Sequence, residues 1–244
     1  MARMQRIVVD SQQILDRIVR LNAEQQHYLH RVLRLGIGDR FIAMDGRGQW
    51  WEVECVSGEN GALWGRIDRT LEVSTELPVA VTLLAALPKG SGFDDAIRQT
   101  TELGVSRIVP VLSQRTLLKP SANKRQRWQR IATEAAEQSE RQIVPTICDP
   151  MTFAEAIDLV ANLQNYICVA RGHVPHLKTR LESRRDLSIS IGPEGGWTSE
   201  EIQTAIDAGF EAVSLGRRIL RAVTAPIVAL SIVAAVCEDG DRMP

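Results

Sequence analysis

Two different patterns of apolar and polar positions follow one another along the chain. In residues 1–72, short β-like runs are separated by glycine turns, and one helical pattern stands among them. The β-like runs are residues 6–9, 40–44, 49–56 and 62–67, and the helical pattern covers residues 23–35. This arrangement predicts a small domain, residues 1–72, that is mostly β and folded as a barrel.

The pattern changes after a polar, proline-ended segment, residues 70–78, which reads as a linker. Apolar strands then alternate with amphipathic helices, which is typical of a parallel sheet covered on both faces. We therefore predict an α/β fold with a second domain over residues 73–244. Its expected strands are residues 79–87, 107–112, 145–148, 166–170, 187–191 and 211–215, and its expected helices are residues 93–103, 124–139, 152–163, 176–183, 199–209 and 225–236.

Composition limits what these domains can do. The chain has 244 residues, 44% of them apolar, and a net charge of −1, so no global field announces a nucleic-acid partner. The longest apolar run, residues 225–236, is too short to cross a bilayer, and no signal peptide is evident. The four cysteines are widely spaced and form no CxxC pair. We expect a cytoplasmic protein with free thiols, no structural metal and no membrane association.

A glycine-rich loop, GPEGG at residues 192–196, directly follows a predicted strand. Its glycines allow a sharp turn that presents backbone N–H groups to a phosphate, a carboxylate or a ribose, and Thr198 is the expected N-cap of the next helix. Open α/β sheets bind ligands beyond the carboxyl ends of their strands, so we predict function here. Glu194 is a candidate acceptor for a ligand hydroxyl or a proton. The alternative is a purely structural turn.

A second glycine turn begins the segment GRRILRAVTA, residues 216–225. It places Arg217, Arg218 and Arg221 beside an apolar helix, and guanidinium groups in such a place commonly hold phosphate or carboxylate. The alternative is that these arginines pair with Glu194 or Glu200.

Other motifs narrow the choice of ligand. The sequence has neither a GxGxxG after the first strand of a βαβ unit nor a GxxxxGK[ST], so a conventional dinucleotide site or P-loop is not predicted. Basic residues gather in two places, which suits RNA phosphates and stacked bases, although a solvated charged face is the alternative. One group is Arg115, Lys119, Lys124, Arg125, Arg127 and Arg130; the other is Arg6, Arg17, Arg20, Arg31 and Arg34, interleaved with His27, Tyr28 and His30.

Seven segments along the chain form one recognisable set. In chain order they are HYLHRVLRLGIGD, LPKG, TELGVSRIVPV, SQRT, KRQRWQRIATEAAEQSERQIVP, IGPEGGWTSEEI and SLGRRILRAVTA. Together they resemble the RsmE family of the SPOUT superfamily, in order and spacing, over nearly the whole chain. The combination of IGPEGG with LGRRILR is specific to this family, whose members methylate N3 of one uridine in 16S ribosomal RNA with S-adenosylmethionine.

The resemblance implies a fold and a partner. It implies a PUA-like N-terminal barrel that helps to hold RNA, a SPOUT-type sheet with a C-terminal trefoil knot that binds a bent cofactor, and a homodimer without metal that acts on 16S ribosomal RNA in the small ribosomal subunit. The cofactor-binding residues it implies are Gly192, Pro193, Glu194, Gly195, Gly196, Leu215, Gly216, Arg218, Ile219, Leu220, Thr224 and Ala225.

The predicted chemistry uses few side chains. Arg218 or Arg221 would stabilise the uridine anion, and Glu194 or a water would accept the N3 proton. The predicted RNA-binding residues are Arg6, His27, Arg31, Arg34, Lys89, Arg115, Lys119 and Arg125.

The chain departs from the family pattern at two positions. Val223 stands where a glutamate is frequent, and Gln99 stands where a lysine is common. These departures motivate an alternative, a non-catalytic RNA-binding or ribosome-assembly protein that keeps the fold. A SPOUT enzyme acting on transfer RNA is a second alternative, disfavoured by the VLRL segment of the small domain.

Overall fold

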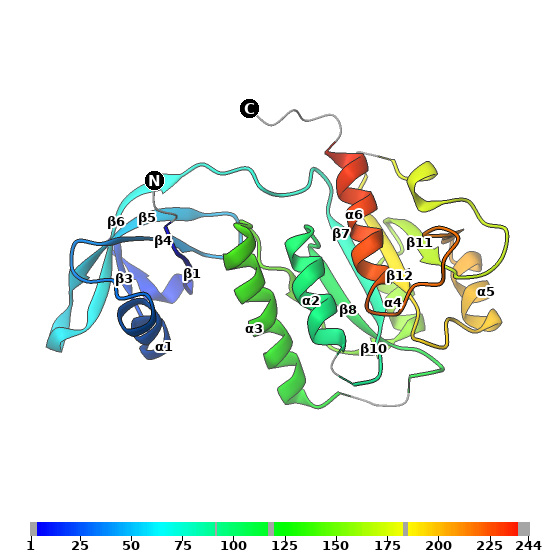
Figure 1. Ribbon diagram of the computed structural model, residues 1–244, viewed down its shortest axis with the longest axis horizontal. Coiled ribbons are helices and arrows are strands. Elements are labelled where there is room, and N and C mark those ends of the chain that lie inside the picture. The colour runs from blue at the N-terminus through cyan, green and yellow to red at the C-terminus, as the bar shows by residue number, and fades with distance from the viewer. Residues whose placement is uncertain (1–3, 91, 117–119, 183–184, 239–244) are drawn as a thin grey trace. The chain divides into compact units, whose positions relative to one another are not determined.

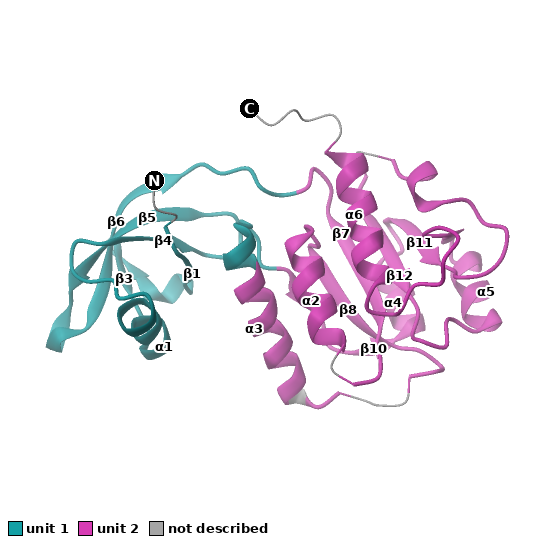
Figure 2. Cartoon of the chain, in the orientation of Figure 1, with its two compact units in different colours: residues 1–76, 136–144 teal, residues 77–135, 145–244 magenta. Residues whose placement is uncertain are grey.

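The computed structural model describes residues 4–90, 92–116, 120–182 and 185–238, and the chain divides into two compact units (Figure 1, Figure 2). The first unit comprises Met1–Glu76 and Ala136–Val144, and the second comprises Leu77–Ala135 and Pro145–Pro244. The sequence pattern did not reveal that residues 136–144 belong with the first unit. The division into domains at residues 72 and 73 stays a prediction.

The first unit is built on a six-stranded sheet in the order β1-β4-β5-β6-β3-β2. Strands β1 and β4 are parallel, and the other neighbours are antiparallel. The prediction of a mostly β unit is confirmed, whereas closure into a barrel stays a prediction. The strands are β1 (Arg6–Val8), β2 (Ile14–Leu15), β3 (Ile18–Arg20), β4 (Arg40–Met44), β5 (Trp50–Ser57) and β6 (Leu63–Leu71), with short 3-10 turns at Ser11–Gln13 and Glu59–Gly61.

The helical pattern of residues 23–35 forms two short pieces rather than one helix. Helix α1 (Ala23–His27) starts at Asn22, whose side chain accepts from the N–H of Gln25 in a capping box. A π-helical turn, η2 (Tyr28–Val32), follows. Arg34 then adopts a positive φ of 59°, which ends the helical path.

The second unit contains a seven-stranded sheet in the order β10-β8-β7-β12-β11-β13, with β9 paired to β8. Every pairing is parallel, as the alternating pattern predicted. Its strands are β7 (Val81–Ala86), β8 (Arg107–Leu112), β9 (Thr146–Ile147), β10 (Met151–Thr152), β11 (Gln164–Cys168), β12 (Leu187–Ile191) and β13 (Glu211–Val213). Its helices are α2 (Gly92–Glu102), α3 (Ala122–Ser139, whose last turn belongs to the first unit), α4 (Phe153–Leu159), α5 (Ser199–Asp207) and α6 (Ala225–Cys237).

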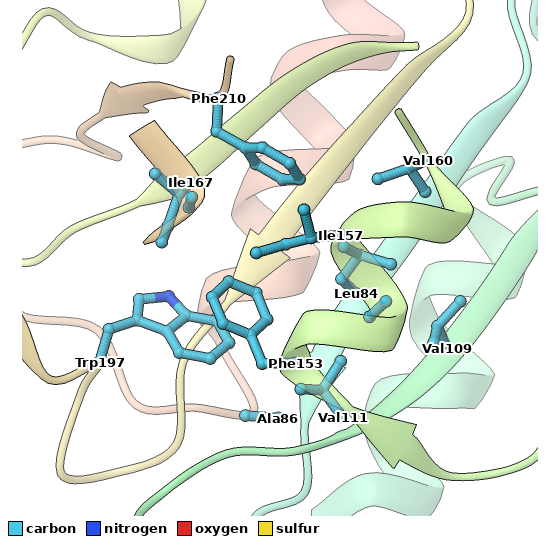
Figure 3. Close-up of a cluster of buried hydrophobic side chains, with 12 residues drawn as sticks. Leu84, Ala86, Val109, Val111, Phe153, Ile157, Val160, Ile167, Trp197 and Phe210 are labelled. Carbon is cyan, nitrogen blue, oxygen red and sulfur yellow. The ribbon is translucent and has the colours of Figure 1, made fainter. Parts of the chain in front are cut away.

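Helices cover both faces of this sheet. On one face, α4 and α5 pack over strand residues such as Leu84 and Val109, and Phe153 stacks on Trp197 at 4.4 Å between ring centroids (Figure 3). Helices α2 and α6 contact each other, and α6 contacts β12; both lie in front of the sheet in Figure 1. Because side chains alternate along a strand, the neighbouring buried residues, such as Leu83, face this second layer.

One element prediction was wrong. The expected helix over residues 176–183 is only a single 3-10 turn, η4 (Leu177–Thr179), within the part that is described. Tyr166 Oη donates to the carbonyl of Arg180 at 2.6 Å, so the chain after the turn is held against β11 instead of continuing as a helix. None of the helices traced in the described ranges is long and apolar enough to span a membrane.

Candidate active site

A cavity of about 400 Å³ opens at the carboxyl ends of strands β11, β12 and β13. This is where parallel sheets place their ligands. Three segments meet there, residues 168–171, 191–197 and 215–222, together with Arg115, Ile202 and Ala225. All the predicted cofactor residues line the cavity except Thr224. The sequence-based prediction missed residues 168–171, although their position at the end of β11 was a usable signal, and it missed Trp197, which follows the glycine loop.

The GPEGG loop turns tightly around its glycines. The N–H of Gly196 donates to the carbonyl of Pro193 at 2.8 Å, and Gly196 has a φ of +70°. A Cβ at Gly192 would lie 3.1 Å from the backbone nitrogen of Trp197. Thr198 caps α5 through a capping box with Glu201, which confirms the predicted N-cap.

Glu194 ties the loop to a second strand end. Its Oε1 accepts from the N–H of Lys89, in the loop after β7, at 2.9 Å. The residue is exposed, and its other carboxylate oxygen accepts no hydrogen bond from any of the described residues. The predicted role of Glu194 as a proton acceptor stays a prediction, and Lys89 reaches this site through its backbone.

Arg115 holds the opposite side of the same loop. Its Nη1 donates to the carbonyl of Gly195 and lies 3.4 Å from the carbonyl of Gly196. The preceding residue, Gln114, donates from its N–H to Glu201 Oε1 at 2.8 Å. The loop after β8 is therefore bonded both to the glycine loop and to the first turn of α5. The sequence predicts that Arg115 binds RNA. In the structure, its side-chain contacts among the described residues are with the candidate cofactor loop.

Within the described ranges, the arginines of residues 216–225 have no acidic partner. Among the described residues, none of the ion pairs or side-chain hydrogen bonds involves Arg217, Arg218 or Arg221, so their pairing with Glu194 or Glu200 is not observed. Arg218 lines the cavity, and the exposed Arg221 lies outside its lining. These guanidinium groups are available to an anionic ligand.

The two departures from the family pattern occupy different surroundings. Val223 packs against the start of α2, since a Cβ at Gly92 would lie 2.5 Å from Val223 Cγ1. Gln99 is exposed further along the same helix. The valine thus makes an apolar contact where the family pattern has a carboxylate.

The remaining predicted RNA-binding residues differ in their exposure and in the contacts that their side chains make within the protein. Arg6 is 10% exposed at its side chain, bonds Glu140 at 2.6 Å and lies over the ring of Trp50, so it acts inside the first unit. Arg125 pairs with Asp149 at 2.8 Å on an exposed surface. His27, Arg31 and Arg34 are exposed on α1 and η2 and just beyond, whereas Lys119 lies outside the described residues.

The cysteines remain free thiols, as expected. Burial raises the pKa of Cys168, which lines the cavity, to about 12, because the thiolate would lose its hydration there. Across the described part of the chain, no group of three or more His, Cys, Asp or Glu side chains is placed to hold a metal ion.

Comparison with known proteins connects this geometry to a family. An RNA methyltransferase domain family matches residues 75–234, and an RNA methyltransferase PUA domain family matches residues 21–66. The ribosomal RNA small subunit methyltransferase E of Synechocystis is 48% identical over 239 residues, which are 96% of this chain and 78% of that protein. The chain belongs to the RsmE family.

Solved RsmE-like structures share the fold over both units. The ribosomal RNA small subunit methyltransferase E of Neisseria gonorrhoeae, bound to S-adenosyl methionine, is 30% identical with a TM-score of 0.86, covering 94% of this chain and 96% of that one. A Legionella pneumophila protein in complex with the bound cofactor SAM is 27% identical with a TM-score of 0.87, covering 96% and 98%.

Proposed function

We propose that this chain transfers the methyl group of S-adenosylmethionine to N3 of a uridine in 16S ribosomal RNA. The observation that carries the proposal is that two glycine loops, separated in sequence by α5 and β13, line one cavity in a chain of the RsmE family. The Neisseria relative, which shares this fold, has S-adenosyl methionine bound.

The cavity fits such a cofactor. A Cβ at Gly192 would crowd the backbone nitrogen of Trp197 at 3.1 Å, so the glycine lets this loop turn tightly at the edge of the cavity. The carbonyls of Gly195 and Gly196 are engaged by Arg115. The volume, about 400 Å³, lies in the usual range for small-molecule sites. When bound, the cofactor supplies an electrophilic methyl group on a sulfonium.

The protein's part is to position the uridine and to stabilise charge. N3 of uridine carries a proton, and the anion left by its removal is delocalised onto two carbonyl oxygens. Arg221 or Arg218, with no acidic partner among the described residues, would donate to one of those oxygens. Glu194, with one free carboxylate oxygen beside the cavity, or a water would accept the proton.

The finer architecture belongs to the same proposal. We propose that residues 1–72 form a PUA-like barrel that holds RNA and that residues 73–244 fold with a trefoil knot. Support for the knot comes from the family and from the meeting of residues 191–197 and 215–222 at one cavity. The ribosomal substrate also argues for a cytoplasmic location.

A homodimer is part of the proposal as well. Helix α6 is apolar except for Ser231, yet Ser231 and Ala235 are exposed, and Ile227 and Ile232 are only partly buried. A second copy would bury this face. Sedimentation at micromolar concentration should give a species of twice the 27.1 kDa chain mass; a monomer with full activity would contradict the dimer.

The experiment for the whole proposal has two arms. Calorimetry with S-adenosylmethionine tests the cofactor, and methyl incorporation into unmodified small-subunit particles tests the reaction. Cofactor binding without methyl transfer would favour the non-catalytic alternative that Val223 and Gln99 motivate. The family membership and the open guanidinium groups favour turnover instead.

A further inference from the structure

A second cavity, of about 400 Å³, lies within the first unit. Its walls come from α1 and η2 on one side and from the ends of β5 and β6 with their connecting loop on the other. Its lining includes His27, His30, Arg31, Ile37 and Ala62. All the lining residues belong to the first unit.

Positive charge at this cavity is not neutralised by the protein. Within the described ranges, no ion pair or side-chain hydrogen bond involves Arg31 or His27. The ring of His30 meets the carbonyl of Leu35 through Nδ1 at 3.2 Å, which leaves Nε2 open to a ligand. None of the described residues that line the cavity carries a carboxylate. The nearby carboxylate of Asp39 accepts from the N–H of Gly36 at 2.7 Å.

Arginines on the neighbouring strands β4 and β6 differ from Arg31, because they form ion pairs with glutamates. Arg40 and Arg69 share the carboxylate of Glu52, and Arg66 bonds Glu54 at 2.6 Å. These three sheet arginines are therefore paired with acids, whereas the cation at the cavity is left for a group outside the chain. An anionic group such as an RNA phosphate satisfies it.

The rim of the cavity is apolar as well as basic. Ile37, which lines the cavity, is 65% exposed. Val32, which follows the lining residue Arg31 in sequence, is 58% exposed. One wall is fixed, because Gln26 accepts from the N–H of Leu63 at 3.2 Å and donates to the carbonyl of Leu21 at 2.9 Å. A rigid wall, flat imidazole rings and an aliphatic side chain form a surface suited to the face of a nucleobase.

We propose that this cavity binds one unpaired nucleotide of the RNA substrate, with its phosphate on Arg31 and its base between Ile37 and the imidazoles of His27 and His30. The proposal rests on the proposed function, because it takes the ligand to be RNA. A paired base cannot enter such a cavity without leaving its stack, so the site selects single-stranded RNA over duplex. The rest of the RNA would be positioned relative to this one nucleotide.

The test uses the full-length protein and a short fluorescent single-stranded RNA, with a duplex of the same length for comparison. Arg31→Ala removes the phosphate contact, and Ala62→Phe fills the cavity while leaving every charge in place. Residue 62 has φ −65° and ψ 147°, which phenylalanine adopts without strain. Arg47→Ala, an exposed arginine outside the lining, is the matched control.

Both cavity variants should weaken single-strand binding about tenfold, within the range of a lost base-stacking contact, and duplex binding should barely change. Arg31→Ala should also lower the slope of log K against log salt by about 0.7, one phosphate on a single strand, whereas Ala62→Phe should leave the slope unchanged. Arg47→Ala should behave as wild type in the discrimination between the two RNAs.

Wild-type single-strand affinity in both Arg31→Ala and Ala62→Phe would overturn the proposal, and thermal unfolding of each variant shows whether it is folded. Failure of the proposed function gives a different result. In that case the unaltered protein fails to methylate small-subunit particles, while the two cavity variants still lose single-strand affinity. A loss that is equal for duplex and single strand would also reject the nucleotide site.

Discussion

Replacing Arg115 with alanine should weaken cofactor binding, although this side chain lies on a loop that the sequence assigns to RNA. In the structure the guanidinium donates to the carbonyls of Gly195 and Gly196, so both carbonyls are held on the side of β8. Without that bond the loop can rotate, and its N–H groups no longer have a fixed direction toward the ligand.

The expected loss of cofactor affinity in Arg115→Ala follows from the kind of hydrogen bond that is removed and from the exposure of Arg115. A hydrogen bond from a charged donor contributes about 1.5–3 kcal/mol when well buried. Arg115 is exposed, so the lower end applies, and about 1.4 kcal/mol corresponds to a tenfold weaker Kd. Arg115→Lys should recover only part of the affinity, because both contacts come from Nη1 at the end of the arginine side chain, and the lysine ammonium has a shorter reach and is more strongly hydrated.

Isothermal titration with S-adenosylmethionine measures the effect, with Arg130→Ala as a control, since Arg130 is exposed and pairs only along its own helix with Glu134. Gly195→Ala supplies a second variant, because its Cβ would lie 3.1 Å from Arg115 Cδ. The loss of cofactor affinity caused by Gly195→Ala should be smaller when Arg115 is already replaced by alanine. Unchanged affinity in Arg115→Ala, together with additive double-mutant effects, would refute the reasoning.

Three further predictions concern rate, stability and reactivity. Arg221→Ala should lower the methylation rate about 10²-fold or more with little change in cofactor Kd, and a full rate would remove this arginine from the mechanism. Gly104→Ala should destabilise the protein by about 1–2 kcal/mol more than Gly209→Ala in denaturant melts. Both glycines end helices with positive φ, but only at Gly104 would a Cβ meet Leu77, at 2.7 Å, so equal losses would contradict this packing. Cys168, whose pKa burial raises to about 12, should resist iodoacetamide at pH 8 in the folded protein and react after unfolding; rapid native labelling would show that the thiol is not desolvated.

The second unit was predictable because its pattern is repeated and local. The alternation of apolar strands and amphipathic helices correctly predicted the parallel sheet. The glycine loops at residues 192–196 and 216–225 correctly predicted most of the cavity lining. Thr198 could be identified as an N-cap because capping depends on residues only three positions apart.

What the sequence did not reveal depends on contacts between distant residues. No local signal brings Arg115 to Gly195, or residues 136–144 into the first unit. The hairpin β2–β3 is short, and its turn residues Asp16 and Arg17 both have positive φ, a conformation that aspartate adopts more often than most residues but that arginine does not indicate. The helix expected at residues 176–183 had a suitable pattern but was outweighed by the bond from Tyr166.

The most direct test of the account is methyl transfer itself. Purified protein, labelled S-adenosylmethionine and small-subunit particles lacking the modification should give incorporation into 16S ribosomal RNA, and mass spectrometry of the digested RNA should show 3-methyluridine at a single position. No incorporation, or a methyl group on a ribose or on another base atom, would contradict the proposed reaction.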